Sequence, residues 1–122
     1  MSMFRRLGAL TALACALAGC AQKPAPASDP VVAKEQSAVA VLKTKYPNVI
    51  TGVDVKGNTL IVYVEPNAMY SMDEDSEAAM KAEALQRWKK AWTSAHPHQH
   101  GVLRMVVNDY FGRELFKSST TV

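Results

Sequence analysis

The sequence predicts an α+β fold: a two-layer sandwich in which two helices pack on one face of a mostly antiparallel sheet of three or four strands. Three observations predict it. Two segments repeat apolar residues at helical spacing, a strand–turn–strand pattern lies between them, and a β-branched run follows the second helix. The expected order is αββαβ with a short additional strand at the end, in one small domain spanning residues 31–122.

The first predicted helix begins at Asp29 and Pro30. Aspartate is a favoured N-cap residue, and proline is favoured at the first helical position. The helix is expected to end before Pro47, because proline disfavours the helical conformation of the residue that precedes it. Its apolar face is predicted from residues at helical spacing, which are Val31, Ala38, Val39, Leu42 and Tyr46.

A β-hairpin is predicted next. Residues 49–55 alternate, with Val53 and Val55 on one face, and residues 60–64 are β-branched or aromatic. Gly57 and Asn58 stand between the two runs and form a two-residue turn signal.

The second predicted helix begins at a capping-box pattern, Ser71 and Glu74, and continues to Ala95. The acidic run over residues 73–77 is interpreted as a first helical turn, because Ala78 stands where a calcium loop of the EF-hand type needs glycine. The residues expected to pack on the sheet are Met80, Ala84, Leu85, Trp88, Ala91, Trp92 and Ala95. Residues 102–107 then predict a third strand, 108–112 a turn, and 114–117 a short fourth strand.

The composition argues against nucleic-acid binding. The chain of 122 residues has a formal charge of +3, and removal of the predicted leader with Arg5 and Arg6 lowers this to +1. A nearly neutral domain lacks the excess of cations that binds a phosphate backbone. The two cysteines are Cys15 and Cys20, and neither is predicted to form a disulfide in the mature domain.

The first 19 residues have the pattern of an export signal. Arg5 and Arg6 precede an apolar run over residues 7–19, which is too short to span a bilayer as a helix. Its end, Leu17-Ala18-Gly19-Cys20, resembles the lipobox of bacterial lipoprotein precursors. The resemblance implies cleavage before Cys20 and attachment of diacylglyceryl and fatty acyl groups such as palmitate to that cysteine.

The resemblance also implies a location. Two or more acyl chains hold a protein stably at a membrane surface. Residues 20–30 are rich in proline, alanine and serine and are interpreted as the lipidated cysteine and a flexible tether. In enteric-type systems an aspartate after the cysteine retains the protein at the inner membrane. Because Ala21 stands there, we expect the outer membrane, on its periplasmic side, in a Gram-negative host.

A second resemblance concerns the domain. The stretch from Val53 to Leu60 is similar to the first hairpin of BON domains, which occur in bacterial envelope lipoproteins and are tied there to membrane or partner binding. Glu65 and Pro66 stand where that family usually has a glycine after the second strand.

A histidine cluster is the sharpest candidate for a site. His96, His98 and His100 are spaced by two, so an extended segment would place three imidazoles on one side, suited to Zn²⁺, Cu²⁺ or Ni²⁺. Met69 and Met72 could add thioether ligands for Cu(I). The alternative interpretation is a solvated polar loop after the helix.

No catalytic motif is present in the sequence. It contains no mature thiol nucleophile, G-x-S-x-G elbow, P-loop or H-E-x-x-H motif. We therefore expect a non-catalytic, lipid-anchored envelope protein without a cofactor, whose domain binds an envelope partner or supports assembly. The alternative is a periplasmic metal-binding lipoprotein that uses the three histidines.

Overall fold

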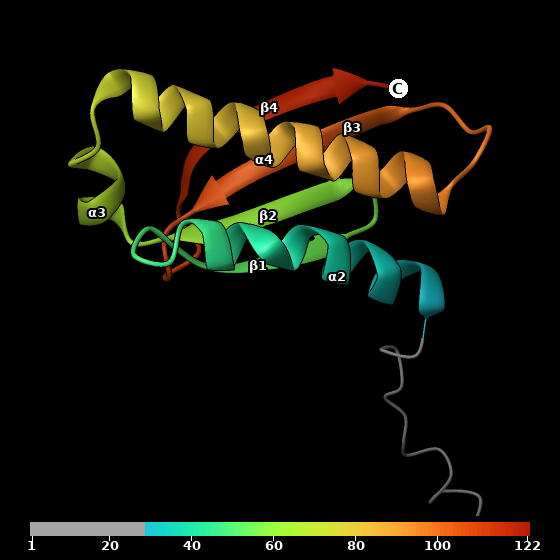
Figure 1. Ribbon diagram of the computed structural model, residues 1–122, viewed down its shortest axis with the longest axis horizontal. Helices are drawn as coiled ribbons and strands as arrows, with labels where there is room; N and C mark the ends of the chain where they lie inside the picture. Colours follow the sequence, from blue (N-terminus) through green and yellow to red (C-terminus); the bar gives the residue numbers. More distant parts are fainter. Residues whose placement is uncertain (1–28) are drawn as a thin grey trace, which may run out of the picture. The chain divides into compact units, whose positions relative to one another are not determined.

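The computed structural model describes residues 29–122 (Figure 1). Along the chain its elements are α2 (Pro30–Lys45), β1 (Ile50–Lys56), β2 (Thr59–Val64), α3 (Pro66–Tyr70), α4 (Glu74–Ala95), β3 (Val102–Asn108) and β4 (Glu114–Thr121). The predicted leader, Cys20 and most of the predicted tether lie outside the described residues.

The four strands form one sheet in the order β1-β2-β3-β4. Two neighbouring pairs, β1 with β2 and β3 with β4, are antiparallel, whereas β2 and β3 are parallel. Helices α2 and α4 lie on the same side of this sheet (Figure 1). The predicted α+β two-layer sandwich is therefore confirmed, with a mixed sheet and a fourth strand that extends to Thr121 rather than Lys117.

The hairpin between β1 and β2 forms where the sequence predicts it. Gly57 adopts a φ of +61°, a conformation that glycine reaches without steric cost and that a two-residue hairpin turn requires. On the strands that flank this turn, Val55 pairs with Leu60, and both side chains are buried under the helices.

Helix α2 begins at Pro30 as predicted, but its buried face is narrower than expected. Glu35, Val39 and Leu42 are buried, at a spacing of four and three residues that keeps them on one stripe. The placement of Val31 and Ala38 on the core face is wrong, because both are exposed. Ala38 lies about 100° around the helix from Val39, and Val31 belongs to the first turn.

The predicted capping box is also wrong. A short helix that the sequence analysis did not predict, α3, occupies residues 66–70, and Ser71 ends it by donating from Oγ to the carbonyl of Asn67 at 2.7 Å. Helix α4 is instead capped by Asp73, whose carboxylate accepts from the backbone nitrogen of Ser76 at 2.8 Å. The acidic first turn of α4 is confirmed, with Glu74, Asp75 and Glu77 placed where the helix dipole favours negative charge.

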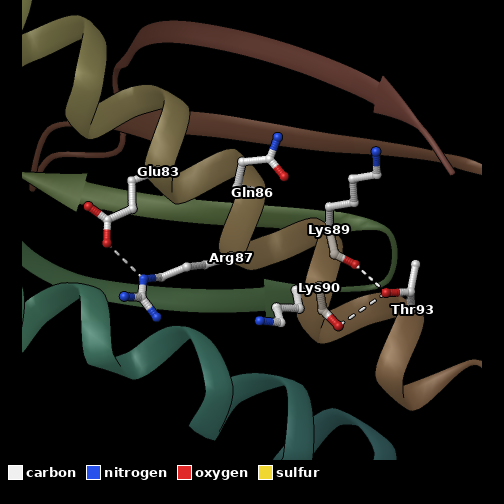
Figure 2. A pocket seen from close by; sticks show the side chains of 6 residues that line it. All are labelled: Glu83, Gln86, Arg87, Lys89, Lys90 and Thr93. Atoms are coloured by element: carbon white, nitrogen blue, oxygen red, sulfur yellow. Dashed lines mark hydrogen bonds and ion pairs between the residues drawn. The ribbon is translucent and has the colours of Figure 1, made fainter.

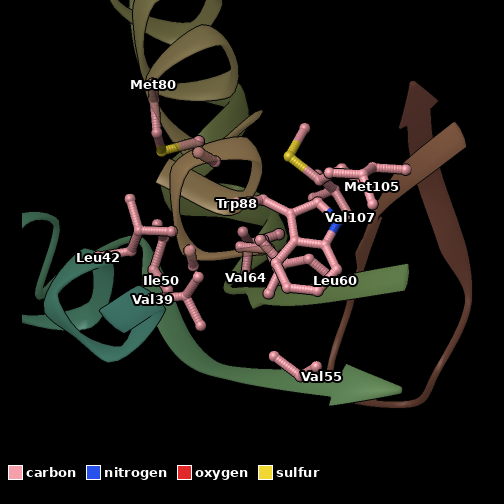
Figure 3. Close-up of a cluster of buried hydrophobic side chains, with 14 of the residues drawn as sticks. Val39, Leu42, Ile50, Val55, Leu60, Val64, Met80, Trp88, Met105 and Val107 are labelled. Atoms are coloured by element: carbon pink, nitrogen blue, oxygen red, sulfur yellow. The ribbon is translucent and has the colours of Figure 1, made fainter. Parts of the chain in front are cut away.

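The core lies between the sheet and the two long helices (Figure 3). Trp88 of α4 is fully buried, and its Nε1 donates to the carbonyl of Asn58 at 3.3 Å. Trp92 is 4% exposed, so both tryptophans pack in the core as predicted. The largest fully buried side chains are Trp88, Leu42, Ile50, Leu60, Met69, Met80, Leu103, Met105, Val39, Val62, Val64 and Val107.

We predict that Trp88→Ala lowers the free energy of unfolding by about 3–5 kcal/mol, since it removes the largest core side chain and leaves a cavity. Urea denaturation followed by circular dichroism measures this. Val41→Ala, on the exposed side of α2, is the control and should change stability by less than about 0.5 kcal/mol. Equal losses in the two variants would contradict the central place of Trp88.

Candidate functional site

His96 closes the end of α4. It is the C-cap residue, its Nδ1 lies 3.0 Å from the carbonyl oxygen of Trp92, and its ring stacks on Trp92 with centroids 4.4 Å apart. The same Nδ1 lies 3.5 Å from Oε2 of Glu35, a carboxylate of α2 that is only 2% exposed. His96 therefore joins the two helices at this end of the domain.

The segment that follows is not extended, so the backbone condition for placing three imidazoles on one side is not met. His98 lies in a turn with a φ of +66°, and His98 and His100 are both exposed. A regular alternation that would place three imidazoles on one side is absent here. Within residues 29–122 no group of three or more histidine, cysteine, aspartate or glutamate side chains is arranged to hold a metal ion. Metal binding by His96, His98 and His100 stays a prediction.

The two methionines lie elsewhere. Met69 of α3 is 1% exposed, and Met72 packs against the core just before α4 begins. The 22 residues of α4 separate them from the histidines, a length of about 33 Å at the usual rise. The structure thus does not bring Met69 or Met72 to the histidine segment.

Positive charge collects where the end of α4 meets α2. We call Lys34, Arg87, Lys89 and Lys90 the basic surface. A hollow of about 510 Å³ is lined by Glu83, Gln86, Arg87, Lys89, Lys90 and Thr93 (Figure 2). A smaller hollow of about 220 Å³ includes Lys34, Arg87, Lys90 and Ser94. Arg87 and Lys90 line both hollows, so the two are adjacent parts of one surface.

Glu83 organises the edge of the basic surface. Its carboxylate accepts from Lys45 Nζ at 2.7 Å, from the Tyr46 hydroxyl at 2.6 Å and from Arg87 Nε at 2.9 Å. These partners, Lys45 first, bring the pKa of Glu83 down to about 2. The same hydrogen bond and partial burial raise the pKa of Tyr46. Glu83 thus connects α4 to the end of α2. The basic surface keeps an excess of positive charge, because Glu83 is the one acid among the residues that line its two hollows.

We predict that Glu83→Gln lowers the free energy of unfolding at neutral pH by about 1–2 kcal/mol, after allowance for solvent screening. A carboxyl whose pKa is depressed in the folded state stabilises the fold above its ordinary pKa of 4.5. The difference between wild type and variant should therefore shrink as pH falls from about 4.5 to about 2. Denaturation at several pH values measures it, and a constant difference would contradict this role.

The turn between β3 and β4 is held by a buried acid. Asp109 is 1% exposed, and its carboxylate accepts from the backbone nitrogens of Phe111 and Arg113, both at 2.9 Å. Arg113 adds its side chain, with Nε and Nη2 each 3.1 Å from Oδ2. The backbone hydrogen bonds, that of Arg113 first, lower the pKa of Asp109. Gly112 completes the turn with a φ of +86°.

Two aromatic side chains stand on this turn, and we call them the aromatic tip. Phe111 is 84% exposed and Tyr110 is 58% exposed, with ring centroids 5.0 Å apart in an edge-to-face arrangement. Sequence reasoning placed a turn over residues 108–112 but missed the display of these rings. The signal available was the spacing of Asp109 and Gly112, which is typical of a β-turn.

The aromatic tip and the histidine segment lie at opposite ends of the domain. Strand β3 begins after the histidines and ends at Asn108, next to Tyr63 at the end of β2. Helix α3, with Tyr70 62% exposed, follows β2 at the same end as the aromatic tip (Figure 1).

Comparison with known proteins identifies no relative. The chain matches no family model, and the searches of curated proteins and of solved structures found no match. The resemblances to lipoprotein precursors and to BON domains therefore stay predictions. None of the helices in the described part of the chain has the length and apolar character needed to cross a membrane.

Proposed function

We propose that this chain is a non-catalytic lipoprotein of the bacterial envelope, anchored through Cys20, whose domain binds a partner protein through the aromatic tip. The observation that carries the proposal is the exposure of Phe111 on a turn held by the buried Asp109. Isolated exposed apolar residues are ordinary in proteins. Here a buried carboxylate with four bonds to the turn fixes the backbone that presents two neighbouring rings.

The physical argument concerns binding entropy. Association loses less free energy when the contacting residues are already ordered, and large aromatic side chains are common at the centres of protein interfaces. Burying a phenylalanine side chain contributes roughly 1.5–3 kcal/mol relative to leaving it exposed. An exposed Phe111 leaves this stabilisation unused in the isolated domain, so a partner with an apolar pocket would gain it.

The position of the aromatic tip supports the same function. The chain enters the domain at Pro30, at the end that carries His96, and the tip lies at the other end. Helix α4, about 33 Å long at the usual rise, runs between the two ends (Figure 1). Because the chain joins the domain at the end away from the tip, an anchor on Cys20 would not need to cover the tip.

The non-catalytic part of the proposal rests on how the strongly held acids are used. Glu83 and Asp109 have lowered pKa values because internal donors satisfy them. A catalytic acid or base requires access to substrate and a pKa near the working pH. Both carboxylates therefore suit a structural role.

We predict that Cys20→Ser moves the protein from the membrane fraction to the soluble envelope fraction, since the acyl chains supply stable membrane attachment. Fractionation with immunoblotting measures the distribution, and mass spectrometry of the wild type should find acyl groups on Cys20. An unmodified Cys20 thiol, or a variant that stays with the membrane as tightly as wild type, would contradict anchoring.

We predict that a photoreactive phenylalanine derivative in place of Phe111 forms a discrete covalent adduct with one envelope protein in intact cells. The same group in place of Val102, which is 51% exposed at the other end of the domain, is the matched control. Adding Asp109→Ala should weaken the adduct from position 111, because the turn loses its acceptor while the reactive ring remains. Identical adducts from positions 111 and 102 would count against the aromatic tip as the binding site.

A further inference from the structure

We propose that the basic surface docks on the anionic headgroups of phospholipids. The residues concerned are Lys34, Arg87, Lys89 and Lys90. They line two adjacent hollows, of which the larger lies along α4 and the smaller lies between α2 and α4. This inference goes beyond the partner binding assigned to the aromatic tip, since it concerns different residues at a different end of the domain.

Charge is separated along α4. Glu74, Asp75 and Glu77 lie in its first turn, whereas Arg87, Lys89 and Lys90 lie toward its other end. Lys81 pairs with Glu77 at 2.7 Å, which neutralises one cation near the acidic end. A chain with a small net charge therefore presents a local excess of positive charge on one part of the helix layer.

Lys34 extends that charge across to α2. Its Nζ lies 3.5 Å from the carbonyl oxygen of Ser94, in the last turn of α4. Among the residues that line the two hollows Glu83 is the acid, and it is already bound by Lys45, Tyr46 and Arg87. The positive charge of Lys34, Lys89 and Lys90 is therefore not cancelled by Glu83.

The residues that line the smaller hollow suit a phosphate group. Ala38 and Ala91 contribute short side chains to its lining, and Lys34, Lys90 and Ser94 contribute donors. Its volume of about 220 Å³ is several times the ~30 Å³ that one water molecule occupies in the liquid. The ammonium groups of Lys34 and Lys90 and the hydroxyl of Ser94 are therefore the groups that would contact a phosphate oxygen there.

The route of the chain favours a membrane as the source of the phosphate. Lys34 lies in the second turn of α2, close to the residue at which the chain enters the domain. Eight residues lie between Cys20 and Asp29 in the sequence, and the nine Cα–Cα steps reach at most about 30 Å when extended. With acyl chains on Cys20, headgroups lie within reach of the basic surface, and each lysine or arginine near an anionic surface contributes about 1 kcal/mol.

The test uses a chain that begins at residue 20 and carries Cys20→Ser, so that lipid attachment does not contribute. All core residues lie between Val39 and Val107, so this chain retains the whole folded domain. Binding is measured by co-sedimentation with vesicles of phosphatidylglycerol and phosphatidylcholine in equal amounts, and with vesicles of phosphatidylcholine alone. We expect binding to the anionic vesicles only, with a marked decrease as salt is raised.

The variant Lys34→Gln with Lys90→Gln should bind the anionic vesicles about 10- to 30-fold more weakly than the parent chain, since two cations are lost. The matched control, Lys56→Gln with Lys117→Gln, removes the same charge from exposed positions on strands β1 and β4 and should bind like the parent. Thermal unfolding of each chain verifies that both double variants remain folded.

Three outcomes would overturn the proposal: equal binding to neutral vesicles, an equal loss in the two double variants, or a loss caused by Phe111→Ala and not by the lysine substitutions. The last outcome would assign lipid contact to the aromatic tip. None of them bears on acylation of Cys20 or on crosslinking from position 111, so failure here is distinguishable from failure of the proposed function.

Discussion

Strands β2 and β3 run parallel, so the chain that leaves β2 has to return along the whole sheet before β3 can begin. Helix α4 makes this return, and Trp88 fastens it by filling the centre of the core and donating to the carbonyl of Asn58. The crossing places the capped, acidic start of α4 beside α3 and its end beside α2. The separation of the aromatic tip from the basic surface follows from this one connection.

Two carboxylates stabilise the surfaces at which we propose binding, and they act at different levels. Glu83 joins separate elements, since Lys45 and Tyr46 come from α2 and the residue after it, whereas Arg87 lies one turn along α4. Asp109 acts within five residues and orders a turn. Because the first contact is long-range, we expect its loss to weaken the packing of α2 against α4, whereas loss of the second should affect only the turn between β3 and β4.

The sequence was sufficient for the elements whose signal is local. Gly57 and Asn58 predicted the hairpin turn, and the spacing of Trp88 and Trp92 predicted the buried face of α4. Prediction failed where two local signals competed. Ser71 fits a capping box, but the unpredicted α3 uses it as a C-cap, and Asp73 then caps α4. The exposure of Phe111 also could not be predicted, because periodicity does not show which apolar residue of a turn the fold leaves uncovered.

The histidine segment shows that residue spacing alone does not predict a site when the backbone conformation is unknown. Its spacing of two predicts a shared side only if the backbone is extended, and the left-handed conformation of His98 removes that condition. His96 is directed instead toward Trp92 and Glu35, so it contributes to the contact between α4 and α2. Lys34, one residue before Glu35, makes a second contact between the same two helices, since its Nζ lies 3.5 Å from the carbonyl oxygen of Ser94. The position of His96 at the end of α4 therefore has a structural explanation in helix packing.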